Sequence, residues 1–370
     1  MKKFIYKVIC TSLPIIFALI AINYFGDAAN LFDTGYEGKM AEIVIRNSYV
    51  TNISNYDERA FQHELITRMK NTPNIVVIGS SRTMLITTDY FPSETLFNNS
   101  VGGASIEDLI AIYQMYKERN YFPKKIIVGI DPWTFNENNG QSKWKSVESY
   151  YLKFHDKTLT TSIANNRFQK YEQLLSLSYF QPSIKNIFKK MSRTSDPVPT
   201  KEKYNITNTK LTDGSLVYRA GYRNASQDEI NRKIANYTIG SIYSIEKFDK
   251  ISKKIWKEFQ EMISDMKNHS IAIELFLSPY APSAYNTISK KYPMVLETEK
   301  VIIKYAQLEN IKVYGSFNPF ELNMNRSYFY DGMHCREKGI ATIMGIELND
   351  TDAQQIASPD GNSAALHYRR

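Results

Sequence analysis

Cysteine and histidine are scarce in this chain of 370 residues, which contains two cysteines and five histidines. Cys10 lies in an apolar N-terminal segment and Cys335 lies near the other end of the chain, so we expect no intrachain disulfide framework. No group of Cys and His residues has the spacing of a zinc site. These absences exclude a disulfide-stapled mini-domain and predict that the protein holds no structural metal.

Clustered basic sequence is also missing, although the formal net charge is +8. The lysines are spread along the chain, and no basic stripe or nucleic-acid-binding motif accompanies them. We therefore expect no nucleic-acid partner and interpret the lysines as a solvated surface. Attraction to an anionic envelope polymer or membrane surface is the alternative interpretation.

The chain begins with a basic and then an apolar segment. Lys2, Lys3 and Lys7 precede an apolar run from Val8 to Ile22. Lysines at this position keep the N-terminus inside the cell. A membrane-spanning helix needs about 20 apolar residues. The run reaches that length when it is counted from Phe4, with the Lys7 side chain snorkelling to the surface.

This segment predicts an uncleaved membrane anchor over residues 1–26, with the rest of the chain outside the cytoplasm. A cleaved signal peptide is the alternative, because Gly26 and Ala28 are small residues at cleavage spacing. Residues 27–73 are mixed and polar, and we interpret them as a membrane-proximal stalk.

Short apolar strands alternate with amphipathic helices between residues 74 and 348. Parallel strands are joined by helices that cover both faces of their sheet. The alternation therefore predicts an α/β domain with three layers, α/β/α, around a five-stranded parallel sheet. The expected strands are 74–79, 96–99, 124–131, 269–280 and 310–315.

Two stretches depart from this alternation. Residues 136–243 are rich in Tyr, Lys, Asn and Ser, and we interpret them as a partly helical insertion that covers the crevice or binds a partner. Residues 349–370 are polar and without periodicity, which predicts a mobile tail.

Polar residues and glycines directly follow four of the expected strands. In parallel α/β sheets the chemistry gathers at the carboxyl ends of the strands. We therefore expect four segments to share one crevice: Gly79–Ser81, Asn98–Ser105, Asp131–Trp133 and Ser278–Tyr280.

The segment FYDGMHCREKG, residues 329–339, points to nucleophilic catalysis. Asp331 and His334 are separated by two residues on a predicted turn, so both side chains can approach one site. An imidazole there can take the proton of a serine while the carboxylate fixes its tautomer and stabilises the imidazolium. Ser81 is the candidate nucleophile. Capping of a following helix by Ser80 or Ser81 is the alternative.

Five segments in order resemble the sequence blocks of the SGNH (GDSL-like) hydrolase superfamily. They are GSSR, NNSVGGAS, VGIDP, LFLSPY and DGMHCREKG, within about residues 74–136 and 270–345. The resemblance implies an SGNH, flavodoxin-like fold. It also implies that Ser81 is the nucleophile, His334 the base and Asp331 its orienting partner, with no cofactor required.

The resemblance also implies an oxyanion hole. Its donors would be the backbone amides of Ser81 and Ser100, with Gly103 in the same block. Three residues differ from the family pattern: Ser80 replaces an aspartate, Ser100 a glycine and Asp131 an asparagine. An ionised Asp131 would repel a developing oxyanion, so it is not expected to take over the role of the asparagine.

Weaker candidates for substrate binding are Ser80, Arg82, Asp131, Trp133 and Tyr280. Asp131 is expected to be protonated, or to bind a substrate or Arg82. Arg82 is a candidate anion contact, with an ordinary ion pair as the alternative. Trp133 and Tyr280 are candidate walls for a sugar ring, with core packing as the alternative.

Within the superfamily, the N-terminal segment, the GSS block and INYFGDAANLF resemble membrane-anchored bacterial envelope proteins of the D-alanyl-teichoic-acid (DltD) and polysaccharide O-acetylation type. This implies an extracytoplasmic serine acyltransferase or esterase that acts on cell-surface polysaccharide or a teichoic-acid-like polymer through an acyl-serine. A membrane-bound O-acyltransferase is the implied partner. A non-catalytic glycan-binding or scaffold protein of the same fold is the alternative, and a free esterase is a third possibility.

Overall fold

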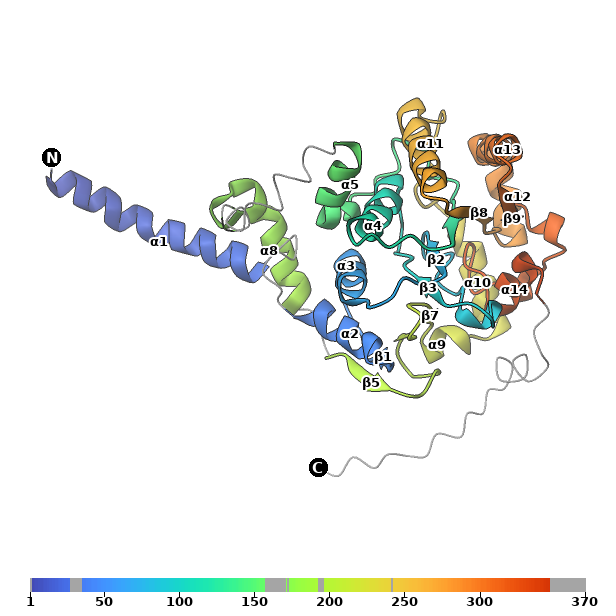
Figure 1. Ribbon diagram of the computed structural model, residues 1–370, viewed down its shortest axis with the longest axis horizontal. Helices are drawn as coiled ribbons and strands as arrows, with labels where there is room; N and C mark the ends of the chain where they lie inside the picture. The colour runs from blue at the N-terminus through green and yellow to red at the C-terminus, as the bar shows by residue number, and fades with distance from the viewer. Residues whose placement is uncertain are drawn as a thin grey trace, which may run out of the picture.

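The computed structural model describes residues 2–26, 35–156, 171, 173–191, 196–240 and 242–346. Figure 1 shows a long N-terminal helix beside a body that is built around a sheet. The tail predicted over residues 349–370 lies outside the described residues, as do parts of the predicted stalk and insertion.

A parallel sheet of five strands forms the centre of the body, in the order β3-β2-β4-β8-β9. Every neighbouring pair in it runs parallel. The predicted five-stranded parallel sheet is therefore confirmed, and each strand lies within its expected range. The strands are β2 (Ile75–Ile78), β3 (Leu96–Asn98), β4 (Lys125–Gly129), β8 (Ala272–Leu277) and β9 (Lys312–Gly315).

Helices flank this sheet (Figure 1). Helix α4 (Ile106–Glu118) packs on β2 and α11 (Lys253–Asn268) on β8, while α13 (Pro293–Leu308) and α14 (Glu337–Met344) pack on β9. Helix α12 (Pro282–Lys291) follows β8. Because helices return the chain to the start of the next parallel strand, the carboxyl ends of the strands lie at one edge of the sheet.

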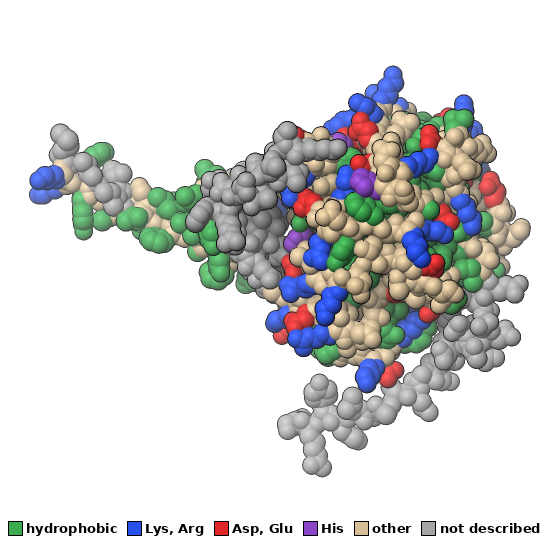
Figure 2. Space-filling model, in the orientation of Figure 1, with side chains coloured by type: hydrophobic (Ala, Val, Ile, Leu, Met, Phe, Trp, Pro, Cys, Tyr) green, Lys and Arg blue, Asp and Glu red, His purple; other side chains and the backbone are tan. Residues whose placement is uncertain are grey.

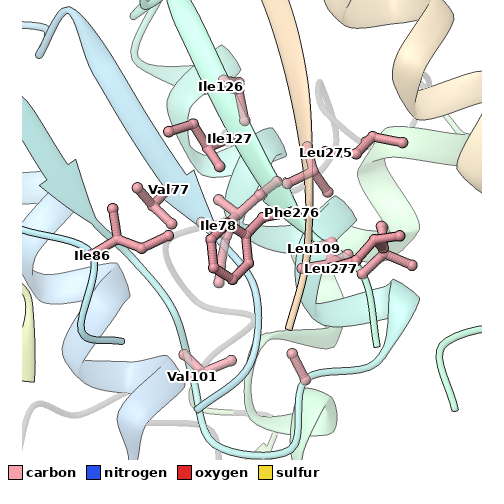
Figure 3. Close-up of a cluster of buried hydrophobic side chains, with 14 of the residues drawn as sticks. Val77, Ile78, Ile86, Val101, Leu109, Ile126, Ile127, Leu275, Phe276 and Leu277 are labelled. Carbon is pink, nitrogen blue, oxygen red and sulfur yellow. The ribbon is translucent and has the colours of Figure 1, made fainter. Parts of the chain in front are cut away.

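The core lies between the central strands and their helices, as Figure 3 shows. Val77, Ile127 and Leu275 are fully buried, and Leu109 of α4 is 1% exposed. Burying a side chain of this size contributes about 1.5–3 kcal/mol. Strands covered on both faces need no polar alternation, which explains why the sequence shows continuous apolar runs here.

A buried ion pair joins α4 to the preceding helix α3 (Glu58–Arg68). Arg59 donates from Nε and Nη2 to the two carboxylate oxygens of Asp108 at 2.8 and 2.9 Å. Asp108 also accepts from the backbone amide of Ser105 at 3.0 Å, at the start of α4. Burial alone would lower the pKa of Arg59, but the neighbouring Asp108 carboxylate raises it above its ordinary value.

Residues 36–68, which the sequence analysis assigns to a stalk, belong to the folded body. Helix α2 (Tyr36–Ile45) packs on α3, and Met40 in it is fully buried. Strand β1 (Tyr49–Thr51) pairs with β5 (Val198–Thr200) from the insertion. The stalk prediction is wrong for these residues because their partner strand is distant in sequence and leaves no local signal.

The described part of the insertion is partly helical, as predicted, and also contributes strands. A second sheet has the order β5-β1-β6-β7, and its pairs run antiparallel. The further elements of the insertion are α5 (Glu148–His155), α8 (Leu177–Met191), β6 (Thr209–Lys210), β7 (Leu216–Val217), α9 (Ala220–Arg223) and α10 (Gln227–Tyr237), with the short 3-10 helices η2 (Lys143–Val147) and η3 (Gln173–Leu175).

The N-terminal helix α1 (Lys2–Gly26) projects from the body (Figures 1 and 2). It packs against α8, and Asn23 Nδ2 donates to the carbonyls of Leu174 and Ser176 at 2.9 and 3.0 Å. In the described part of the chain, no helix combines the length and the apolar character needed to cross a membrane. The predicted membrane anchor therefore lacks structural support.

Replacement of Arg59 by Met tests the buried ion pair. Asp108 would remain buried without its partner, and breaking such a pair costs about 3–5 kcal/mol. We expect the free energy of unfolding in urea, followed by circular dichroism, to fall by that amount. Arg46→Met is the matched control, because its pair with Glu42 has side chains 76% and 51% exposed. The control is expected to cost about 0.5 kcal/mol. Equal losses in both variants would contradict the assigned role of the buried pair.

Candidate active site

A tight turn after β2 presents Ser81 at the carboxyl edge of the sheet. Gly79 begins the turn beside Gly129 of β4, and a Cβ at Gly79 would meet the side chain of Thr83. The Thr83 amide donates to the Ser80 carbonyl at 3.1 Å and closes the turn. Ser81 follows Ser80 and is half-buried. The abrupt end of an apolar strand at a glycine thus places a hydroxyl at the rim of the sheet.

Ser81, His334 and Asp331 form a continuous hydrogen-bonded chain. Ser81 Oγ lies 2.9 Å from His334 Nε2, and His334 Nδ1 lies 2.8 Å from Asp331 Oδ2. The other carboxylate oxygen, Oδ1, accepts from the backbone amides of Met333 and His334 at 2.8 and 2.9 Å. One carboxylate therefore folds the loop and orients the imidazole toward the serine, the geometry in which a histidine can take a serine proton.

The Asp331 carboxylate is held in its ionised form. Burial alone would raise its pKa, but the His334 imidazole and hydrogen bonds from His334, Tyr222 and the Met333 amide lower the pKa of Asp331 well below its ordinary value. An ionised carboxylate at Nδ1 stabilises the imidazolium that forms when the serine loses its proton.

The guanidinium of Arg82, which follows β2, is buried beside this hydrogen-bonded chain. It contacts the residues that follow β4 and β8 and the loop that carries His334. Arg82 Nε donates to the Met333 carbonyl at 3.1 Å, next to His334, and Nη2 donates to the Ser278 carbonyl after β8. Nη1 pairs with Asp131 Oδ1, after β4, at 3.3 Å. Arg82 therefore connects the turn that carries the serine to the loop that carries the histidine.

The predicted substrate contacts surround this guanidinium instead of lining a crevice. Arg82 lies over the Tyr280 ring at 4.5 Å and the Trp133 ring at 5.9 Å, measured from Cζ to the ring centroids. Ser80, Arg82, Asp131, Trp133 and Tyr280 are at most 4% exposed. The structure thus shows the alternative arrangement for three of these residues: an ion pair for Arg82 and core packing for the rings of Trp133 and Tyr280.

Asp131 is the buried partner of Arg82. Burial raises the pKa of Asp131 above its ordinary value, although Arg82 and Ser80 act in the opposite direction. The carboxylate faces the guanidinium, which is one of the roles that the sequence left open for this residue.

The three predicted oxyanion donors differ in whether their backbone amides already form a hydrogen bond. The Ser100 amide donates to Asn98 Oδ1 at 3.0 Å and is therefore engaged within its own turn. Within the described chain, the amides of Ser81 and Gly103 form no hydrogen bond and remain as donors. Gly103 has φ 62°, and a Cβ there would collide with the Tyr243 hydroxyl, so glycine is required at this position.

Tyrosines of the insertion complete the site, although they were not among the residues predicted for it. The Tyr222 hydroxyl donates to Asp331 Oδ2, the oxygen that also faces His334 Nδ1. The Tyr218 ring lies 6.3 Å from the His334 ring, and Tyr237 packs against Gly332. The sequence shows that the insertion is rich in tyrosine, but no motif or regular spacing relates these tyrosines to Asp331.

No family model matches this chain, and no curated protein matches it. Among solved structures, the chain is similar to a protein from Bacteroides fragilis NCTC 9343 that is assigned as an acylhydrolase. The identity is 10% and the TM-score 0.38, with 82% of this chain and 98% of that chain covered. A likeness of this size carries no argument about chemistry. The chemistry of the site follows instead from the arrangement of Ser81, His334 and Asp331.

Replacement of Arg82 by Met tests its connecting role. Asp131 would remain buried without its counter-charge, and the carbonyls of Met333 and Ser278 would lose their donor. We expect a loss of stability of about 3 kcal/mol and a large fall in the rate at which a fluorophosphonate labels Ser81. Arg82→Lys keeps the charge but cannot reach all three acceptors, so it should label at an intermediate rate. Wild-type labelling by Arg82→Met would contradict this role.

Replacement of Tyr222 by Phe removes the hydroxyl and keeps the ring. The Tyr222 hydrogen bond is one of the interactions that lower the pKa of Asp331, so its loss leaves a carboxylate of higher proton affinity beside His334. We expect the acidic limb of the pH profile of Ser81 labelling to move upward by about half a unit. Tyr218→Phe is the control, because in the described structure its hydroxyl makes no hydrogen bond. Coincident profiles for both variants and the wild type would exclude the effect.

Proposed function

We propose that this protein is a serine acyltransferase or esterase of the SGNH type that acts on a cell-surface polysaccharide or teichoic-acid-like polymer. The observation that carries the proposal is the hydrogen-bonded chain from Ser81 Oγ through His334 to Asp331, at 2.9 and 2.8 Å. An isolated serine hydroxyl is a poor nucleophile, and this chain supplies the base that it needs. The resemblance of five sequence blocks to that superfamily is the second support.

The proposed reaction proceeds through an acyl-serine. Ser81 Oγ attacks the carbonyl carbon of the acyl donor while its proton passes to His334 Nε2, and Asp331 stabilises the resulting imidazolium. Collapse of the tetrahedral intermediate breaks the bond to the leaving group, which takes the proton from His334. In the second half, His334 takes a proton from a sugar hydroxyl or from water, and that oxygen attacks the acyl carbon. The bond from the acyl carbon to Ser81 Oγ then breaks, and Ser81 Oγ takes the proton from His334.

We further propose that the protein works at the cell envelope beside a membrane-bound O-acyltransferase that supplies the acyl group. The support is the order of segments along the chain, which resembles that of envelope acylation proteins. Helix α1 also presents apolar side chains outward: Ile15, Phe17 and Phe25 are 66%, 66% and 64% exposed. Figure 2 shows this apolar surface along the projecting helix.

Labelling of the full-length protein with a fluorophosphonate, read by intact mass, tests the chemistry. We expect one adduct in the wild type and a loss of labelling rate of at least ~10³-fold in Ser81→Ala and in His334→Ala. Ser289→Ala is the control, because Ser289 lies on α12 outside the site. Burial raises the pKa of the Cys335 thiol to about 12, so this neighbour of His334 should not compete for the probe.

Two outcomes separate the proposal from its alternative. An unlabelled but folded wild type would favour a non-catalytic glycan-binding protein, for which the engaged Ser100 amide is the specific observation. Labelling that survives in Ser81→Ala would place the reactive group elsewhere. Once Ser81 is established, acetyl esters with and without sugar acceptors distinguish transfer from hydrolysis.

A further inference from the structure

A groove of about 450 Å³ lies between η2 and α8, and its lining includes none of Ser81, His334 and Asp331. We name it the lysine groove, because Lys143, Lys145 and Lys185 line it. Asp57, Ser142 and Gln181 are also part of its lining. Each of the three lysines is exposed.

The lysines of this groove lack anionic partners within the described chain. The ammonium groups of Lys143, Lys145 and Lys185 form no ion pair or hydrogen bond with the described residues. Other lysines of the body are paired at short distances, such as Lys117 Nζ with Asp265 Oδ2 at 2.8 Å. Three uncompensated ammonium groups around one concave surface create a positive potential that attracts anions.

Among the described residues that line the groove, Asp57 is the one carboxylate, and it is already engaged. Asp57 Oδ1 accepts from the backbone amides of Arg59 and Ala60 at 2.9 and 3.1 Å, where it caps α3. The same oxygen accepts from Ser146 Oγ at 3.4 Å. Asp57 therefore serves the start of a helix and pairs with none of the three lysines.

The groove adjoins the candidate active site through two neighbours in the chain. Glu58, which follows Asp57, accepts a hydrogen bond from the Gly102 amide. Gln141, which precedes Ser142, lies against Gly103.

The turn that contains these two glycines leans on the turn that carries Ser81. The Val101 amide donates to the Gly79 carbonyl at 2.9 Å, and Ser100 Oγ lies 2.8 Å from Thr83 Oγ1. Two residues of the groove lining, Asp57 and Ser142, are thus the sequence neighbours of residues that contact this glycine turn. The glycine turn in turn contacts the turn that carries Ser81.

We propose that the lysine groove binds phosphate or carboxylate groups of the polymer on which the protein acts. One unit of the polymer lies in the groove while a neighbouring unit of the same polymer reaches Ser81. The inference rests on the proposed function, and it narrows the substrate to an anionic polymer. Ammonium groups on flexible stems suit repeated phosphates of variable spacing. The hydroxyl of Ser142 and the amide of Gln181 add hydrogen-bond partners for polyol or sugar hydroxyls.

The test measures binding of fluorescein-labelled dextran sulfate to the full-length protein by anisotropy, with neutral dextran of equal length beside it. The variant Lys143→Gln/Lys145→Gln/Lys185→Gln should bind dextran sulfate about tenfold more weakly, since each screened contact contributes a modest free energy. Its affinity should also depend less on salt. Circular dichroism and thermal unfolding establish that the variant is folded.

The matched control is Lys290→Gln/Lys291→Gln/Lys304→Gln. It removes the same charge from exposed lysines of α12 and α13, which also lack ion pairs within the described residues. The proposal requires wild-type affinity for dextran sulfate in this control. Equal weakening in both triple variants would show diffuse attraction by net charge and would overturn the proposal, as would equal affinity of the wild type for neutral dextran.

A vesicle arm separates a soluble polyanion from a lipid headgroup. Vesicles of phosphatidylcholine and phosphatidylglycerol that bind through the groove lysines, with no binding of dextran sulfate, would overturn the proposal in favour of membrane docking. Ser81→Ala should bind dextran sulfate as the wild type does, because Ser81 lies outside the groove. If the wild type binds dextran sulfate through the groove lysines but is not labelled at Ser81, this inference stands and the proposed chemistry is wrong.

Discussion

The arrangement of the candidate site depends on one buried cation. A guanidinium withdrawn from water is stable only when its donors and its charge are matched by fixed partners. Arg82 finds them at the Met333 carbonyl in the histidine loop, at the Ser278 carbonyl after β8 and at Asp131 after β4. Satisfying this one side chain therefore fixes the distance between the serine turn and the histidine loop.

The same constraint accounts for the residues at positions 80 and 131. A neutral asparagine in place of Asp131 would leave the guanidinium without a counter-charge. Ser80 takes part as well, because its hydroxyl accepts from the Arg82 amide at 3.1 Å. One interacting group is therefore formed by Ser80, Arg82 and Asp131. The backbone amides of Ser81 and Gly103 lie outside this group and form no hydrogen bond in the described chain.

The five strands and the Ser81, Asp331 and His334 positions could be predicted because their signals are local: apolar runs, a terminal glycine and the D-x-x-H spacing. Trp133 and Tyr280 could not be placed, because an aromatic side chain after a strand gives the same signal whether it walls a crevice or covers a buried arginine. Tyr222 and β1 escaped prediction for a different reason. Their partners, Asp331 and β5, lie far away in sequence, and a single sequence carries no record of such pairs.

The insertion is therefore part of the candidate site and not a cover added to a finished one. Tyr222 donates to the carboxylate that orients His334, and Tyr243 packs where Gly103 lacks a side chain. The same insertion supplies η2 and α8 around the lysine groove. A sheet edge alone would present the serine to any small ester, whereas one inserted segment here contacts the base's carboxylate and forms the adjoining groove. The packing of the insertion thus contributes both to the orientation of His334 and to the shape of the lysine groove.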